Sequence, residues 1–145
     1  LNGGPMTVLG FSFGAYIATY LAASCQAQRL ILRSPALYPD EGWTVPKEAL
    51  DEQGLMAYRN QFHDALSNEA LHCCEKFKGD VLLVDSENDE VIPRPVIASY
   101  EAAFASARSM TRHTVQGADH PLTEARWQNE YLKVVLEWLR NDRSR

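Results

Sequence analysis

The chain has 145 residues, of which 46% are hydrophobic, and its formal net charge is −5. This length and apolar content favour one domain with a sizeable hydrophobic core. The acidic balance, without a block of Lys and Arg, argues against nucleic acid as a partner, and no apolar run approaches the roughly 20 residues of a membrane helix.

The first part of the chain predicts two buried strands separated by a helix. Residues 7–9 form a short apolar run, and residues 13–28 carry apolar and small side chains at helical spacing. Residues 29–33, Arg-Leu-Ile-Leu-Arg, indicate a second strand that ends at Ser34 and Pro35. The small side chains of the helix would let it pack closely on the sheet.

Residues 38–79 are less regular, and we interpret them as a short helical insertion that is a candidate for a small lid. The insertion begins as a loop. Residues 47–62 then have a helical pattern that is interrupted at Gly54, and Ser67 is placed to cap a helix over residues 68–77. A short turn leads from there back into an apolar strand.

The last part of the chain predicts two more strands and two more helices. Residues 81–85 and 111–115 read as strands, with a helix over 96–107 between them and an amphipathic helix over 124–140. The apolar positions of the last helix at helical spacing are Leu132, Val135, Leu136 and Leu139. Strands that alternate with helices predict an α/β fold, with helices on both faces of a sheet of about four mainly parallel strands.

The sequence Gly10-Phe11-Ser12-Phe13-Gly14 stands where the first strand gives way to the first helix. A sharp turn there would hold the Ser12 side chain at the carboxyl end of the strand, and Gly10 and Gly14 would avoid clashes with the neighbouring chain. Amides at the start of the helix would favour a developing negative charge. Ser12 is therefore a candidate nucleophile, and the alternative is a serine that only caps an ordinary helix.

A serine hydroxyl needs a base to act as a nucleophile, and the chain offers four histidines. His120 is the candidate because it lies in a glycine-containing loop between the last strand and the last helix, and loops at the carboxyl ends of parallel strands gather catalytic groups. His63 and His72 lie in charged helical segments, and His113 lies within a strand. We interpret these three as surface or structural side chains.

An acid must also orient the histidine and stabilise its charged form. Asp85, Glu87, Asp89 and Glu90 all follow closely on the third predicted strand. Asp85 comes directly off the strand and Asp89 lies four residues later in the loop. Spacing alone leaves the choice between these two aspartates open.

Together these residues resemble the α/β-hydrolase superfamily, in which nucleophile, acid and histidine follow in that chain order. The segment VLGFSFGA is similar to the nucleophile elbow of that family, VLLVDSENDEVIP to its acid loop, and GADHPL to its histidine loop. The resemblance implies that Ser12 is the nucleophile, Asp89 the acid and His120 the base. It also implies that the N–H of Phe13 donates a hydrogen bond to the oxyanion.

The resemblance extends over essentially the whole chain but over only part of the family's fold. Members usually have eight strands with the elbow after the fifth, so the strands expected here resemble strands five to eight. We therefore expect residues 1–145 to form a single α/β-hydrolase-like domain that lacks its N-terminal half. The strand edge near Thr7 would then be exposed, free to pair with a second copy or with the N-terminal half.

The function implied by the resemblance is that of a serine hydrolase. It would cleave carboxylic esters or related small acyl compounds through an acyl-enzyme, with no cofactor and no metal. The same three residues would suit an acyltransferase, a thioesterase or a peptidase. A chain that lacks half of the fold could instead act only as a binding or structural unit.

Some aromatic and sulfur-containing side chains have less specific interpretations. Side chains of the insertion that would line an acyl pocket, or equally well pack in a core, are Tyr38, Trp43, Met56, Tyr58 and Phe62. An odd number of cysteines with two adjacent (Cys25, Cys73 and Cys74) argues against a disulfide framework, so we assign them to helix packing. The N-terminal residues LNGGP do not resemble a signal peptide, and the expected location is the cytoplasm.

Overall fold

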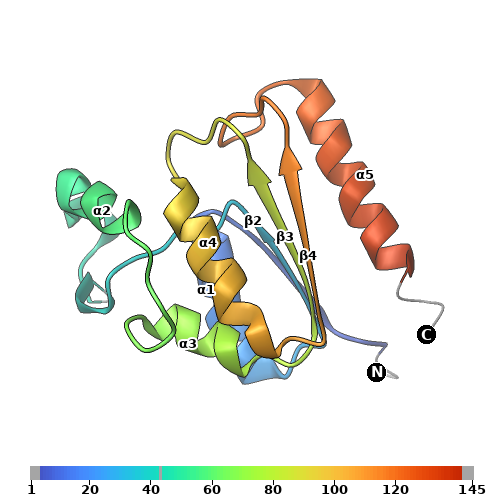
Figure 1. Cartoon of the computed structure of the whole chain (residues 1–145), viewed down its shortest axis with the longest axis horizontal. Helices are drawn as coiled ribbons and strands as arrows, with labels where there is room; N and C mark the ends of the chain where they lie inside the picture. Colours follow the sequence, from blue (N-terminus) through green and yellow to red (C-terminus); the bar gives the residue numbers. More distant parts are fainter. Residues whose placement is uncertain (1–3, 43, 142–145) are drawn as a thin grey trace.

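A parallel sheet organises the computed structural model of the chain, which describes residues 4–42 and 44–141 (Figure 1). Within these residues the sheet has four strands in the order β1-β2-β3-β4, and each neighbouring pair is parallel. The strands are β1 (Thr7–Phe11), β2 (Arg29–Arg33), β3 (Asp80–Ser86) and β4 (Ser109–Val115). The predicted fold class is therefore confirmed, and β1, β3 and β4 are each two residues longer than predicted.

Helices cover both faces of the sheet, as the apolar strands predict (Figure 1). One face carries α1 (Phe13–Cys25), α3 (Glu69–Lys76) and α4 (Arg94–Ala103), and the opposite face carries α5 (Ala125–Asn141). Alternate side chains of the inner strands point to opposite faces. In β2 and β3, the larger core receives Leu30, Leu32, Val81 and Leu83, whereas the smaller core beneath α5 receives Ile31, Leu82 and Val84.

The first helix is shorter than its sequence pattern predicts. It ends at Cys25 rather than near residue 28, because Gln26 adopts a left-handed conformation with a φ of 55°. The N–H of Gln26 still donates to the carbonyl oxygen of Ala22, so the last turn of the helix is closed before the chain leaves it.

The insertion between β2 and β3 contains short helical segments. These are the 3₁₀ turns Asp40–Gly42 and Lys47–Ala49, followed by α2 (Glu52–Arg59) and α3. In Figure 1, α2 lies farther from the sheet than α3 does. Trp43, one of the side chains considered for an acyl pocket, lies outside the described residues.

Two expectations about the insertion were wrong. Gly54 does not interrupt a helix but lies in the first turn of α2, where the Asp51 side chain accepts hydrogen bonds from the N–H groups of Gln53 and Gly54. The cap of α3 is Asn68 rather than Ser67. The side-chain oxygen of Asn68 accepts from the N–H of Leu71 at 3.3 Å, whereas Ser67 donates to the carbonyl oxygen of Asp64.

The amphipathic helix at the end of the chain is confirmed, but only part of its apolar face is buried. Val135 packs in the smaller core with Trp127, and Leu139 packs against that core. Leu132 and Leu136 are exposed, so the apolar face of α5 is wider than the surface that the sheet offers to it. Among the described residues, none of the helices combines the length and the apolar character needed to cross a bilayer. The three cysteines are not disulfide-bonded.

Candidate active site

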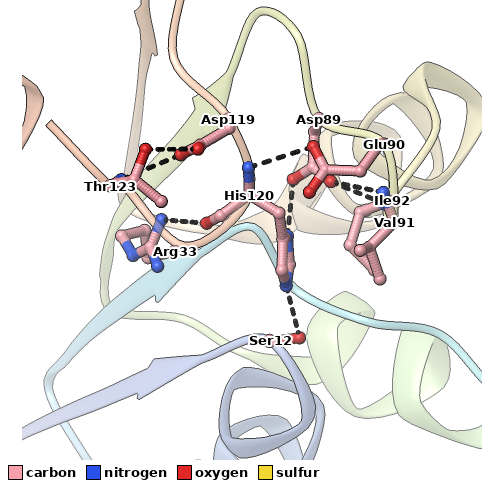
Figure 2. Close-up of polar contacts among 9 residues, drawn as sticks. All are labelled: Ser12, Arg33, Asp89, Glu90, Val91, Ile92, Asp119, His120 and Thr123. Atoms are coloured by element: carbon pink, nitrogen blue, oxygen red, sulfur yellow. Dashed lines mark hydrogen bonds and ion pairs between the residues drawn. The ribbon is translucent and has the colours of Figure 1, made fainter.

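Three polar side chains meet at the carboxyl ends of the parallel strands (Figure 2). Ser12 follows β1, Asp89 lies in the loop after β3, and His120 lies in the loop between β4 and α5. Parallel strands end at the same edge of a sheet, which is where α/β folds collect ligands and reactive groups. The fold thus brings together residues that lie far apart in the sequence.

The turn at Ser12 has an unusual backbone conformation. Its φ of 53° and ψ of −116° lie outside the regions that non-glycine residues ordinarily adopt. Two backbone hydrogen bonds fix the turn to the end of β2. The N–H of Ser12 donates to the carbonyl oxygen of Arg33 at 3.0 Å, and the carbonyl oxygen of Ser12 accepts from the N–H of Ala36 at 3.1 Å.

The two glycines beside Ser12 differ in what they contribute. A Cβ on Gly10 would lie 2.6 Å from the Cα of Ala15, and closer still to the carbonyl oxygen of Gly14. Gly10 is therefore required where α1 crosses the end of β1. A Cβ on Gly14 would meet no atom of the described residues within 4 Å. The expectation that both glycines avoid a clash is thus correct for Gly10 and wrong for Gly14.

The Ser12 side chain points toward His120 rather than toward the helix. Ser12 stands at the N-cap position of α1, yet its side chain makes no capping hydrogen bond to the helix amides that the structure describes. Its Oγ lies 2.9 Å from the Nε2 of His120 instead. The cap interpretation therefore describes the position of Ser12 in the chain but not the contacts of its side chain.

His120 is also hydrogen-bonded to Asp89, with 2.7 Å between its Nδ1 and the Oδ2 of the carboxylate (Figure 2). The other carboxylate oxygen of Asp89 accepts from the N–H groups of Val91 and Ile92, at 2.9 and 2.8 Å. Burial alone would raise the pKa of Asp89, but these hydrogen bonds, with the one from His120 the largest, outweigh it and hold the pKa below its usual value. Asp89 is therefore ionised at neutral pH.

The ionised carboxylate determines where the proton sits on the His120 ring. A carboxylate can only accept hydrogen bonds, so Nδ1 must carry the proton and donate a hydrogen bond to Asp89. In the neutral ring Nε2 is then an acceptor, and the Ser12 hydroxyl donates to it. His120 is only 8% exposed, so few water molecules compete for these bonds.

The second candidate acid, Asp85, has other partners. Its Oδ1 accepts from the hydroxyl of Thr114 at 2.9 Å, and Arg112 forms an ion pair with the same carboxylate at 3.3 Å. Of the two aspartates that the spacing leaves open, the structure thus brings Asp89 to His120 and ties Asp85 to β4.

The other histidines are engaged elsewhere. His63 stacks on the ring of Tyr58, with 3.8 Å between the ring centroids, and His72 lies 3.4 Å from the carboxylate of Glu75. His113 pairs with Glu130 of α5 at 2.8 Å. Each of the three is thus engaged with a residue other than Ser12.

Phe13 contributes a backbone N–H and an aromatic ring beside Ser12. It is the first residue of α1, where the helix dipole favours a negative charge. Its ring stands edge-on to the ring of Tyr38, with centroids 5.8 Å apart, and Tyr38 in turn packs on Tyr16. Of the other side chains considered for an acyl pocket, Met56 and Tyr58 are half-buried and Phe62 is exposed.

Arg33 and Phe11 adjoin the site, and the sequence analysis did not single them out. Arg33 donates from Nη1 to the carbonyl oxygen of His120 at 2.9 Å, and the Phe11 ring lies beside the imidazole, with centroids 5.1 Å apart. A charged residue at the end of an apolar strand was the available signal for Arg33. Within residues 4–42 and 44–141, no group of three or more His, Cys, Asp or Glu side chains is arranged to hold a metal ion.

Comparisons with known proteins give a family and a fold. The model of an uncharacterised protein family (UPF0227) matches residues 2–137. None of the curated proteins matches the chain. Similar solved structures include Est1E from Butyrivibrio proteoclasticus, with 16% identity and a TM-score of 0.72 over 98% of this chain and 63% of that one.

Two further structures give the same result. The esterase domain of a Rhodothermus marinus protein has 16% identity and a TM-score of 0.69, over 94% of this chain and 61% of that one. A monoacylglycerol lipase from Paleococcus ferrophilus has 17% identity and a TM-score of 0.66, over 94% and 68%. The chain thus has part of the α/β-hydrolase fold, and it spans about half to two thirds of the chains it matches.

Proposed function

The chain belongs to the UPF0227 family, and we propose that it is a serine hydrolase that cleaves carboxylic esters or related acyl compounds. The observation that carries this proposal is the continuous set of hydrogen bonds from Ser12 through His120 to Asp89. The esterase and lipase among the similar structures support the same reaction class. The turn at Ser12, with Gly10 before it, has the features of a nucleophile elbow.

In the proposed reaction the Oγ of Ser12 attacks the carbonyl carbon of the ester while its proton passes to Nε2 of His120. Asp89 keeps the ring in the required tautomer and stabilises the imidazolium. The N–H of Phe13 donates to the oxyanion of the tetrahedral intermediate. The intermediate collapses to an acyl-enzyme, and the alcohol leaves with the proton from Nε2.

Water completes the cycle. It gives a proton to Nε2 of His120 and attacks the acyl carbon, and the second tetrahedral intermediate releases the acid as the proton returns to Ser12. The ring of Phe13, the residue after Ser12, is 40% exposed and packs edge-on against Tyr38, and this ring supports an apolar acyl group. No step of this sequence requires a cofactor.

A fluorophosphonate probe tests the proposal because it reacts with a serine whose hydroxyl is activated by a base. We expect the protein to be labelled, the Ser12→Ala variant not to be labelled, and the Ser24→Ala variant to be labelled as the wild type is. Ser24 is a matched control because it lies on the same helix, exposed, and its hydroxyl donates to the carbonyl oxygen of Leu21. Labelling that persists in Ser12→Ala, or a wild type that is never labelled, would contradict the proposal.

We also propose that the outer edge of β1 pairs with a further strand. Among the described residues β1 pairs with β2 alone, so its other edge presents backbone groups without a neighbouring strand. Leu9 is 53% exposed in the middle of the strand. In the chain by itself the added strand would come from a second copy, and an N-terminal half of the fold would occupy the same edge in its place.

A further inference from the structure

His120 is held by its backbone as well as by its ring (Figure 2). Its carbonyl oxygen accepts from Nη1 of Arg33 at 2.9 Å, and its N–H donates to the carboxylate of Glu90 at 3.4 Å. The loop that carries His120 lies between β4 and α5 and has no ladder of strand or helix hydrogen bonds of its own. These two contacts hold the main chain of His120 itself, in addition to the bonds of its neighbours in the loop, such as the one from the N–H of Thr123 to the Asp119 carboxylate.

Arg33 is an unusual residue to find at this place in the fold. It is the last residue of β2, it is 6% exposed, and its guanidinium lies 3.6 Å from the centroid of the Phe11 ring. Burial lowers the pKa of Arg33, and the nearby Tyr131 and Asp89 side chains only partly offset this. An arginine nevertheless keeps its charge in proteins, so a cation is buried here.

A buried cation is costly unless it is well hydrogen-bonded, which is why such groups usually face carboxylates. Arg33 directs Nη1 to the main-chain carbonyl of His120, and the nearby carboxylates of Asp89 and Asp119 also favour its charge. An apolar side chain at the end of β2 would fill the same space without that cost. Two kinds of contact therefore distinguish an arginine from an apolar residue at this position: the hydrogen bond to His120 and the contacts of the guanidinium with the Phe11 and Tyr131 rings.

Phe11 links the guanidinium to the imidazole. The guanidinium of Arg33 lies over the Phe11 ring. The same ring packs beside the His120 ring, with centroids 5.1 Å apart and planes tilted by 35°. A cation over an aromatic face is attracted to it, so Arg33 also holds the Phe11 ring in place. Phe11 is 41% exposed, so Arg33 and His120 are among the few side chains that its ring can pack against.

We propose that Arg33 is a positioning residue for His120, fixing its backbone by the hydrogen bond to its carbonyl oxygen and its ring through Phe11. The inference rests on the proposed function, because it assigns Arg33 to the hydrogen-bonded set of Ser12, His120 and Asp89. The carbonyl oxygen of Arg33 accepts from the N–H of Ser12, but this scheme gives the Arg33 side chain no contact with the Ser12 hydroxyl or with the ester. Its loss displaces Nε2 from the Ser12 hydroxyl and slows proton transfer without changing how the ester binds.

The test is a kinetic comparison of Arg33→Met, Arg33→Lys and Arg112→Met with the wild type. Arg112→Met is the matched control, because Arg112 is a sheet arginine that pairs with Asp85 and Glu101 instead of His120. A misplacement of about 1 Å typically costs about 100-fold in rate, so we expect kcat of Arg33→Met to fall by about 10- to 100-fold. KM should change little, Arg33→Lys should recover part of kcat, and Arg112→Met should keep it.

The fluorophosphonate probe separates positioning from folding, because titration with it counts the competent sites. The proposal requires kcat per labelled site to fall in Arg33→Met. Phe11→Leu, which removes the ring between the two groups, should lower it in the same direction. An unchanged kcat per labelled site in Arg33→Met, or a rise in KM in place of the fall in kcat, would overturn the positioning role and leave the serine hydrolase intact. An unchanged value in Phe11→Leu alone would overturn the part of that role that acts through the ring. A wild type that is not labelled would overturn the serine hydrolase itself.

Discussion

The edge strand β1 and the inner strand β3 differ in how far their residues are buried. All seven residues of β3 are buried, and β4 and α5 complete the layers around that strand. In β1, by contrast, only Gly10 is buried, and Leu9 is exposed on a strand whose outer edge has no neighbour among the described residues. Asp89 thus follows a fully buried strand, which we call the completed side, and Ser12 follows an exposed edge strand, the open side. The strand β4, which leads to His120, is the other edge of the described sheet, and only its last residue, Val115, is buried.

The difference lies in the pairing of the strands: β3 has a strand on each side, whereas β1 pairs with β2 alone among the described residues. Strands of parallel sheets are normally buried on both faces, and the apolar run of β1 fits that rule although its surroundings do not. Leu132 and Leu136 are also exposed, and they belong to α5, the helix on the opposite face of the sheet from α1. We therefore expect substitutions on the two sides to have different consequences.

The largest effect should come from the completed side, in the comparison of Asp89→Asn with Asp85→Asn. An amide at position 89 would no longer hold the Nδ1–H tautomer of His120, so kcat should fall by about 10⁴-fold. Asp85→Asn should cost much less, because that carboxylate is bound to Arg112 and Thr114. Steady-state kinetics on a chromogenic ester measure both. A greater loss in Asp85→Asn would transfer the role of the acid to Asp85.

On the open side, Gly10→Ala and Gly14→Ala form a matched pair beside Ser12. The methyl group at position 10 would collide with the backbone of α1 where it crosses β1, and such overpacking typically costs about 1–3 kcal/mol. At position 14 the methyl group has room, and alanine in a helix is favoured over glycine by about 0.5–1 kcal/mol. Urea unfolding of both variants measures the difference. Equal free energies of unfolding would contradict the close approach of the α1 backbone to Gly10.

The completed side should also make folding depend on pH through Asp89. Its pKa in the folded chain lies below the value of about 3.9 for an unfolded aspartate, so the unfolded chain takes up a proton first as the pH falls. The stability that Asp89 contributes is thus present above about pH 4 and is lost as the pH falls through its folded pKa. We expect the stability gap between wild type and Asp89→Asn, measured by urea unfolding, to narrow on acidification. A gap that is the same at pH 7 and pH 3 would contradict this.

The smallest effect on folding, but a clear one on association, is expected for Leu9→Lys. A lysine on an exposed strand edge discourages pairing with another chain and should change the free energy of unfolding by no more than about 0.5 kcal/mol. Leu66→Lys is the control, because Leu66 is 90% exposed in the insertion.

Sedimentation at increasing concentration is the measurement. The 145-residue chain should self-associate, less so with Leu9→Lys and as before with Leu66→Lys. A monodisperse, thermally stable wild-type monomer would contradict the pairing edge.

Local sequence patterns were sufficient for most of the fold. The apolar runs of β1, β2 and β3 and the helical spacing of α1 and α5 are signals within single segments, and the structure confirms these elements. The pairing of Ser12 with His120 follows from the fold class, because the carboxyl ends of parallel strands meet at one edge.

Other features depend on contacts that no single segment contains. Asp85 lies near the end of β3 and Asp89 in the loop that follows it, and only the three-dimensional arrangement separates the partner of Arg112 from the partner of His120. The position of Arg33 beneath the His120 loop likewise depends on contacts between residues 87 positions apart. The exposure of Leu132 could not be read from its spacing either, because the spacing gives the apolar face of α5 but not the width of the sheet beneath it.

The most direct test of the serine hydrolase is to trap the acyl group during turnover. The protein is mixed with an activated aryl ester, quenched with acid within the first turnovers, digested and analysed by mass spectrometry. We predict an acyl group on the peptide that contains Ser12, and no acylated peptide in Ser12→Ala. Hydrolysis that proceeds with the acyl group on another residue, or with none on Ser12, would contradict the proposed role of Ser12.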